Sequence, residues 1–514
     1  MRVSAATVFL FFFASLRLGA RQVLILSISV YKEIPMEISE KGMSEEEVFA
    51  KLEASRKDDL KWQEGRAFGY VFDPGKDVMA VGKKAYSAFL SENGLDFTVF
   101  QSLRRLEKEL AAFGARHLGG DENVVGNFSS GGTESIILAV KAARDCYREK
   151  RPEIKQPEMI LPTTAHAAFH KAAHYLDVTV VRVGVDPRTF KVQADKVRQA
   201  ITENTIMLVG SAPSYSQGVI DPIQDLSDIA IEKNLWLHTD ACMGGFLLPY
   251  FKRLGEPVPD FDFSVPGVSS ISMDLHKYAY APKGASLVLY RNKDLRRYQI
   301  FACSGWIGYT IINNAVQSSK SGGPMAAAWA VLNYLGDTGY LEIARKKLAA
   351  VKKIAAGIEK IDGIRLLAQP QMSLLAFTSD TINVFHIIDE MNARGWYIQP
   401  ALSYDNSPAH IHLSITASNV GWEEELLKDL AECVQTAAKL PEGDLVKMVR
   451  EGLKDIDLAN VSDADIKGLL AMAGIDGQAG LPDRMADING VLDEFPAEAR
   501  EKILISFVND LFVQ

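Results

Sequence analysis

Cysteine is scarce in this chain of 514 residues, which contains only four: Cys146, Cys242, Cys303 and Cys433. They are scattered, and no two of them form a C-x-x-C pair. This spacing does not suggest a disulfide framework or a structural zinc site, and no metal site is expected. Free thiols at this low density fit a reducing compartment, and we expect a cytoplasmic protein.

The chain also lacks a surplus of positive charge. Its 56 lysines and arginines are outnumbered by 65 acidic residues, which gives a formal net charge of -9. Proteins that bind the phosphate backbone of nucleic acids generally carry a basic surface, so nucleic acid is not an expected partner. Any phosphate group would be held at one local site.

No apolar run in the first thirty residues is long enough for a membrane span. Arg2 precedes an apolar run at 3–16, and a second run at 23–30 follows Arg17 and Arg21. A span needs about 20 apolar residues, and arginine is costly within hydrocarbon. The segment fits either a signal or anchor that contacts a membrane or a peripheral extension, and both interpretations stay open.

Short β-branched runs alternate with helical stretches between about residues 158 and 290. Six of these runs predict strands: Met159 to Leu161, Thr179 to Val183, Ile206 to Val209, Trp236 to Thr239, Ser269 to Met273 and Ser286 to Tyr290. This alternation is typical of an α/β protein with a mostly parallel sheet, in which ligands bind at the carboxyl ends of the strands. A helical segment at 341–361 and strand runs at 374–377 and 410–415 predict a smaller α+β domain.

Four regions follow from these patterns. They are an apolar N-terminal segment (1–35), a helical segment (36–125), a large α/β domain (126–335) and a small C-terminal α+β domain with a helical tail (336–514). The folded body is expected to begin near Met36, because Ser44 and Glu47 have the spacing of a helix capping box.

The first motif with chemical content is SSGGTES at 129–135, which precedes an apolar helical pattern. Its glycines, Gly131 and Gly132, would let the backbone approach an anion, and the positive end of a helix beginning there would favour a phosphate group. A structural Gly-Gly turn before a helix would give the same pattern.

Three further side chains fall at or near the ends of predicted strands. Asp240 ends an apolar run and could keep a pyridine nitrogen protonated, or it could simply cap a helix. Lys277 follows another run, where partial burial would free its amine as a nucleophile, although most lysines are solvated. His166 could lie on a cofactor ring or be a buried structural histidine.

Together these motifs form an ordered set: a phosphate turn, an imidazole, a strand-end carboxylate and a strand-end lysine. That set is what catalysis with pyridoxal 5'-phosphate (PLP) requires. The chain resembles the group II PLP-dependent decarboxylases of fold type I, and within them the sphingosine-1-phosphate lyases. The stretches that carry the resemblance are SGGTESIILAVKAARD, PTTAHAAFHKAAHYLDV, QGVIDPIQDLSDIA, HTDACMGGFLLPY and HKYAYAPKGASLVLY.

The resemblance implies a PLP-transferase fold with a large, seven-stranded type of sheet, and it implies roles for individual residues. Lys277 would carry the cofactor on its amine, Asp240 would pair with the pyridine nitrogen, and His166 would stack on the ring. The residues expected to bind the cofactor phosphate are Gly132, Thr133 and His276. Ser321, Gly322 and Gly323 would reach the site of a neighbouring subunit, so a homodimer with shared sites is expected, to which the segment 36–125 contributes.

The substrate positions match the lyases less well. Lys283, in APKG, matches their substrate-phosphate lysine. The lyases read NPLH where this chain has Asn93-Gly94-Leu95-Asp96, so a carboxylate replaces an imidazole. They also carry tyrosines near Phe72 and Leu470. These changes remove donors and add a negative charge, which would weaken the binding of a phosphate monoester by several kcal/mol.

Two activities follow from the resemblance. The first is a retro-aldol cleavage at Cα of a phosphorylated long-chain base, which gives an aldehyde and phosphoethanolamine in sphingolipid metabolism. The alternative is decarboxylation of an aromatic or acidic L-amino acid, which Asp96 favours because the loss of phosphate ligands affects only the first activity.

Overall fold

The structure, a computed structural model, describes residues 38, 40–453 and 484–511. The predictions made for residues 1–35 and for Leu470 therefore lie outside the described residues. Within the described ranges, no helix combines the length and the apolarity that a membrane span needs.

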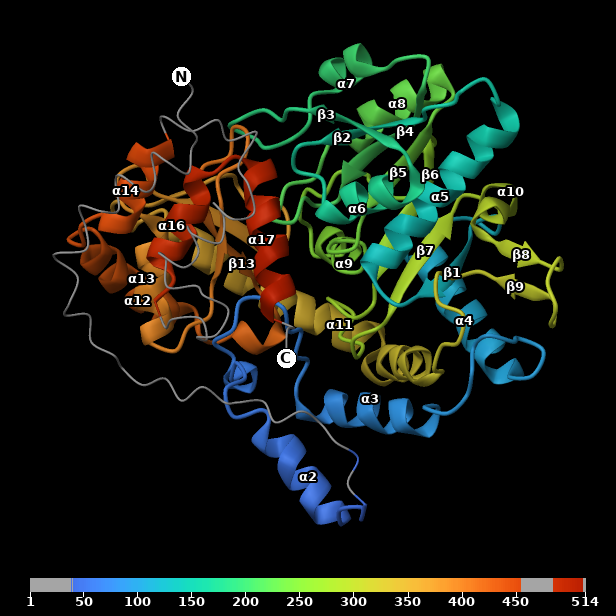
Figure 1. The fold of residues 1–514 in the computed structure, drawn as a ribbon, viewed down its shortest axis with the longest axis horizontal. Helices are drawn as coiled ribbons and strands as arrows, with labels where there is room; N and C mark the ends of the chain where they lie inside the picture. The colour runs from blue at the N-terminus through green and yellow to red at the C-terminus, as the bar shows by residue number, and fades with distance from the viewer. Residues whose placement is uncertain (1–37, 39, 454–483, 512–514) are drawn as a thin grey trace, which may run out of the picture.

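A seven-stranded sheet forms the centre of the large domain (Figure 1). Its strands are β1 (Val125–Ser129), β2 (Glu158–Pro162), β3 (Thr179–Val183), β4 (Thr205–Ser211), β5 (Trp236–Asp240), β6 (Val268–Asp274) and β7 (Ser286–Tyr290). Their order is β1-β7-β6-β5-β4-β2-β3, and only β7 runs antiparallel to its neighbours. The predicted mostly parallel α/β sheet is therefore confirmed, with β1 as an additional strand that the sequence did not reveal.

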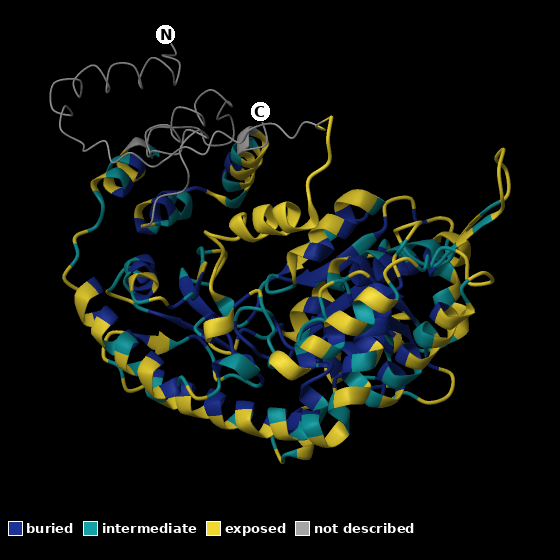
Figure 2. Ribbon diagram, turned by 90° about the horizontal axis from the view of Figure 1, so that it is seen from below, coloured by how far each residue is buried: buried dark blue, intermediate teal, exposed yellow. Residues whose placement is uncertain are grey.

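Helices cover both faces of this sheet, so its central strands are buried along their whole length. One core lies under α5 (Gly132–Lys150) and α6 (Ala167–Leu176). The other lies under α4 (Gln101–His117), α7 (Ala194–Ala200), α8 (Ile223–Lys233) and α9 (Leu248–Arg253). Alternate strand residues enter opposite cores, as Trp236 and Leu237 of β5 do. Figure 2 shows the buried strands enclosed by helices whose outer faces are exposed.

The long helix α11 (Gly323–Ile358) connects the large domain to the smaller one and kinks at Gly336, whose backbone leaves the helical region. The predicted helix at 341–361 is the second half of α11. The smaller domain has the sheet order β10-β11-β13-β12. Its elements are β10 (Arg365–Leu366), β11 (Leu374–Thr378), β12 (Gln399–Ala401), β13 (His410–Ser414), α12 (Val384–Ala393) and α13 (Glu423–Ala437). It is the expected α+β domain and has its own apolar core.

The remaining described segments lie at the periphery. They are α2 (Glu45–Ala54), α3 (Lys76–Ala88), the short α10 (Lys293–Arg296), the hairpin β8 (Phe301–Cys303) and β9 (Ile311–Asn313), and the tail helices α14 (Asp444–Leu453), α16 (Ala486–Glu494) and α17 (Ala497–Leu511). The tail helices share a separate apolar cluster. The predicted capping box is present, because Ser44 Oγ accepts the N–H of Glu47 and Glu47 accepts the N–H of Ser44.

Candidate active site

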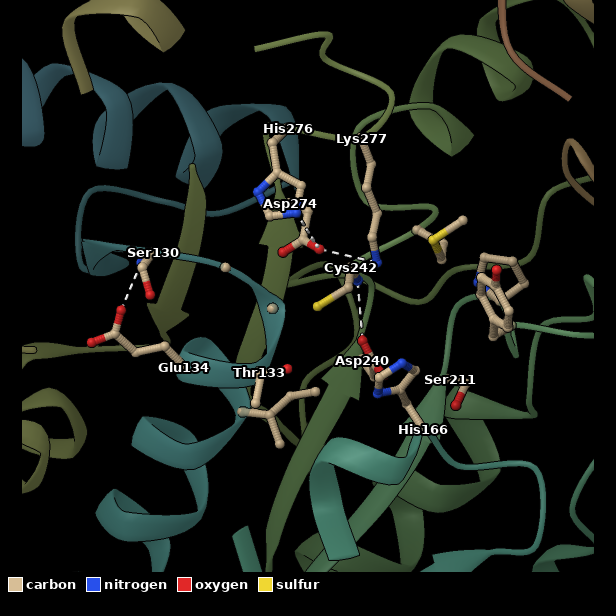
Figure 3. Close-up of a pocket in the computed structure, with 16 residues that line it drawn as sticks. Ser130, Thr133, Glu134, His166, Ser211, Asp240, Cys242, Asp274, His276 and Lys277 are labelled. Atoms are coloured by element: carbon tan, nitrogen blue, oxygen red, sulfur yellow. Dashed lines mark hydrogen bonds and ion pairs between the residues drawn. The ribbon is translucent and has the colours of Figure 1, made fainter. Parts of the chain in front are cut away.

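A cavity of about 380 Å³ opens where the carboxyl ends of five strands meet (Figure 3). The residues that line it follow β1, β2, β4, β5 and β6. Although β1 lies beyond β7, it runs in the same direction as β6, so the turn after it reaches the same edge of the sheet. The sheet therefore brings together side chains that lie up to about 150 residues apart in the sequence, from Ser130 to Lys277.

The turn after β1 leaves the N-terminus of α5 open toward this cavity. Gly131 occupies the cap position and has no side chain that could accept a hydrogen bond from the first turn of the helix. A methyl group at Gly132 would lie 2.7 Å from Sγ of Cys242 and 2.9 Å from Oδ2 of Asp274, so only glycine fits there. The end of α5 has no capping side chain, and Gly131 and Gly132 have no Cβ. An anion in the cavity could therefore come close to the backbone N–H groups of this helix end.

Asp240 is the last residue of β5, and hydrogen bonds fix its carboxylate. Its Oδ1 accepts from the backbone N–H of Cys242 at 3.1 Å and from the hydroxyl of Ser272 at 3.3 Å. The two ring nitrogens of His238 hydrogen-bond with Ser270 and Ser272 at 2.8 and 3.2 Å, and burial lowers the pKa of His238 to about 4. His238 is therefore neutral, and Ser272 links it to the carboxylate of Asp240.

His166 caps α6 with its own ring. Its Nδ1 accepts the backbone N–H of Ala168 at 3.1 Å, so in the neutral ring the proton is on Nε2. Burial lowers the pKa of His166, and the negative charge of Asp240 only partly offsets this effect. The imidazole is thus neutral at physiological pH, held in one orientation, and part of the cavity wall.

Lys277 extends into the cavity and ends 3.0 Å from Oδ2 of Asp274, the last residue of β6 (Figure 3). Burial alone would lower the pKa of Lys277, but the charge and hydrogen bond of Asp274, together with the charges of Cys242 and Asp240, outweigh it and raise that pKa. His276 lies 3.5 Å from the same oxygen and accepts the N–H of Ala285 on Nδ1, so its Nε2 is the available donor. The structure thus places a lysine, an imidazole and a carboxylate directly beside the open end of α5.

These residues fit PLP. The end of α5 and His276 Nε2 would hold its phosphate, Lys277 would carry it covalently, and Asp240 and His166 would face its ring. Each of these residues lines the single cavity described above. The roles themselves remain predictions, but the arrangement that they require is present.

Lys283 and Phe72 are adjacent to each other outside the cavity. The ammonium group of Lys283 lies 5.0 Å from the centre of the Phe72 ring and donates to the carbonyl of Tyr70 at 2.8 Å. The Phe72 ring in turn contacts Tyr278 edge to face, with centroids 5.0 Å apart. Tyr278 follows Lys277 in the chain, so these two substrate candidates adjoin the segment that carries the reactive lysine.

Asn93 and Ser321, predicted separately, lie beside each other. They form an isolated β-bridge, and the N–H of Gly322 donates to the carbonyl of Glu92 at 2.8 Å. Asp96, three residues further on, is exposed and accepts hydrogen bonds from the N–H and hydroxyl of Thr98. In the part of the chain that the structure describes, Asn93, Asp96 and residues 321–323 do not line the cavity of their own subunit.

Asp274 and Tyr215 are among the cavity residues to which the sequence gave no role. Asp274 directly follows the strand run predicted to end at Met273, and its position three residues before Lys277 was the available signal. Tyr215 follows β4, donates its hydroxyl to Gln399 of the small domain at 2.7 Å, and packs on His412 with centroids 4.4 Å apart. Nothing in the local sequence distinguishes Tyr215, because its partners come from a distant segment.

Comparison with known proteins gives the same assignment. The family model described as the pyridoxal-dependent decarboxylase conserved domain matches residues 93–380. A second model, described as "Pyridoxal-dependent enzyme, C-terminal putative HTH domain", matches residues 444–510, the tail that contains α14, α16, α17 and Leu470. The fold and the site thus define a PLP-dependent lyase of fold type I.

Individual relatives show which family within this class the chain belongs to. Sphingosine-1-phosphate lyase of Oryza sativa subsp. japonica is 41% identical over 78% of this chain and 74% of its own length. The lyase of Arabidopsis thaliana is 40% identical over 77% of this chain and 73% of its own. The structure of a Burkholderia pseudomallei sphingosine-1-phosphate lyase superposes with a TM-score of 0.75 at 37% identity, covering 83% of this chain and 97% of that one. The chain belongs to the sphingosine-1-phosphate lyase family.

Proposed function

We propose that this protein cleaves the Cα–Cβ bond of a phosphorylated long-chain base, releasing a long-chain aldehyde and phosphoethanolamine. The observation that carries the proposal is the 41% identity to a sphingosine-1-phosphate lyase over most of the chain. Amino-acid decarboxylation is the less favoured alternative.

The residues of the cavity have distinct tasks in this reaction. PLP, when bound, supplies an electron sink for the bond that breaks at Cα. The fixed carboxylate of Asp240 would stabilise positive charge on the pyridine nitrogen. His166 presents its Nε2 proton from a rigid ring, and Lys277 brings an amine to the same cavity, so either group can transfer a proton at the reacting carbon.

The assay that tests the proposal supplies the purified protein with a phosphorylated long-chain base and, separately, with a panel of L-amino acids. We expect aldehyde and phosphoethanolamine from the first substrate and no carbon dioxide from the second. Carbon dioxide from an amino acid, without aldehyde from the lipid, would replace the lyase by the decarboxylase.

We propose that Lys283 binds the substrate phosphate, and its titration makes this testable. Loss of hydration around its ammonium group, together with the Lys277 charge, lowers the pKa of Lys283 to about 8 although the residue as a whole is exposed. Below this pH the group is an ammonium ion that attracts phosphate, and above it the group becomes neutral. The kcat/KM for the phosphorylated base, divided by that for the unphosphorylated base, should fall by up to about tenfold per pH unit above pH 8.

Lys283→Arg is the matched control, since a guanidinium keeps its charge throughout this range. The ratio should then stay flat between pH 7 and 9.5. A ratio that is already flat in the unaltered protein would remove Lys283 from the phosphate site.

We further propose that Asp96 limits affinity for the phosphate. Asp96→His should raise kcat/KM for the phosphorylated base about fivefold, the effect of an exposed charge interaction near 1 kcal/mol. Asp96→Asn preserves the turn with Thr98 and removes only the charge, so it should recover part of this gain. Unchanged or lower values in both variants would place Asp96 outside the substrate site.

The protein would act as a homodimer in which the surface around Asn93 and Ser321 completes the partner's site. In support of this, Ser321 is exposed where residues 92–94 and 320–322 meet, and the apolar side chains of Leu90, Phe97 and Val99, close by in the chain, are also exposed. Apolar side chains clustered at the surface are common where subunits meet.

A further inference from the structure

Asp274 is the most deeply buried carboxylate beside Lys277. Its side chain is 1% exposed, and in the described residues its Oδ1 has no hydrogen-bond partner. The carboxylate packs against Gly132 so closely that any side chain there would overlap it. A carboxylate in such surroundings is stable only if a cation accompanies it or if it binds a proton.

Lys277 provides that cation. His276 lies further from Oδ2, at 3.5 Å against 3.0 Å, and burial lowers its pKa, so it is neutral. Burial alone would raise the pKa of Asp274, but the charge and hydrogen bond of Lys277 contribute most to lowering it, and the pKa of Lys277 is raised by Asp274 together with Cys242 and Asp240. The other titratable groups that the described residues place around the pair are His166, Tyr215, Asp240, Cys242 and Lys283. Both shifts favour a pair of opposite charges.

This pairing conflicts with the chemistry expected of Lys277. An amine attacks an aldehyde only as the neutral base, because an ammonium ion has no free electron pair. We propose that Asp274 is a positioning residue that holds the amine of Lys277 as an ammonium ion whenever this amine is not bonded to the cofactor. The inference rests on Lys277 as the cofactor carrier and goes beyond it in assigning Asp274.

Two consequences follow. The ammonium ion stays at a fixed place in the cavity with a proton to donate. In addition, cofactor capture by the empty protein is slowed, because Lys277 must leave Asp274 and lose a proton before it can react.

The test measures how fast the cofactor-free, full-length protein captures PLP, followed by absorbance between pH 7 and 9.5. In the unaltered protein the rate should rise with pH as the amine deprotonates. Asp274→Asn removes the anion but keeps the shape, so burial then lowers the pKa of Lys277. Since one pKa unit changes the fraction of free amine tenfold, we expect capture at pH 7.5 to be at least about tenfold faster, with a flatter pH profile.

Pyridoxal, which lacks the phosphate, distinguishes an effect of Asp274 on the amine of Lys277 from simple repulsion between the Asp274 carboxylate and the cofactor phosphate. Both aldehydes should be captured faster by the variant if the carboxylate acts on Lys277. Acceleration with PLP alone, or no acceleration with either, would overturn the proposal. Asp260→Asn, which breaks the exposed pair with Lys252 at 2.5 Å, is the matched control and should leave both rates unchanged.

Competitive acetylation of the cofactor-free protein tests the same point without the variant, in case Asp274→Asn does not fold. Peptide mass spectrometry against pH should show Lys277 reacting only at a higher pH than the exposed Lys252, even though Asp260 raises the pKa of Lys252 as well. Lys277 reacting at a lower pH than Lys252 would contradict the ion pair. Because this readout needs no substrate, failure of the proposed lyase activity would leave it unaffected.

Discussion

Lys277→Ala is expected to reduce turnover by about 10⁴-fold or more while the chain still folds. The amine is the group that would carry the cofactor, and no other lysine lines the cavity described here. Borohydride reduction of the cofactor-loaded, unaltered protein should correspondingly fix the cofactor to the peptide that contains Lys277. Turnover at more than a few per cent in the alanine variant, or label on another peptide, would contradict the assignment.

Lys277→Ala should also change the stability of the protein. This change separates the electrostatic role of the Lys277 side chain from its role as the cofactor carrier. Alanine leaves the carboxylate of Asp274 buried beside a neutral His276, so the cofactor-free variant should melt at a lower temperature than the unaltered protein. Lys277→Arg keeps a cation there but cannot form the covalent link. It should be as inactive as the alanine variant and melt closer to the unaltered protein.

Asp240→Asn is expected to lower kcat by about 10² to 10³-fold, the usual effect of removing one preorganised charge from a reaction centre. The amide can still accept from the N–H of Cys242, so the wall of the cavity should keep its shape. The loss should therefore fall on kcat far more than on KM. A decrease in kcat of less than tenfold would show that the carboxylate does not act on the developing charge.

Much of the fold could be predicted from local patterns. Short β-branched runs alternating with helical stretches identified β2 to β7 within one or two residues at each end, because β-branched residues fit the pleated surface of a sheet. β1 was missed, since VGNFS contains a glycine and an asparagine and has little strand character. Helix α11 was predicted only from its second half, because the kink at Gly336 divides it.

Some residues of the candidate site could likewise be predicted from local motifs, and others could not. Gly132, His166, Asp240 and Lys277 stand in recognisable local motifs, and the structure brings all four to one cavity. Asp274 and Tyr215 were not predicted as site residues. Each is distinguished by a contact that the fold creates, not by a local motif around it in the chain. The adjacency of Asn93 and Ser321 could not be seen for the same reason.

The sequence by itself determined the chemistry, since the order of a phosphate turn, an imidazole, a carboxylate and a lysine is written in short contiguous motifs. Only the tertiary structure decided which charges meet. Strand order places β1 and β6 at one edge despite more than a hundred intervening residues, and burial then forces the Asp274 carboxylate to pair with the nearest cation. Periodicity encodes which face of an element is buried, whereas the electrostatic partner of a buried group depends on the distance to residues that no local pattern specifies.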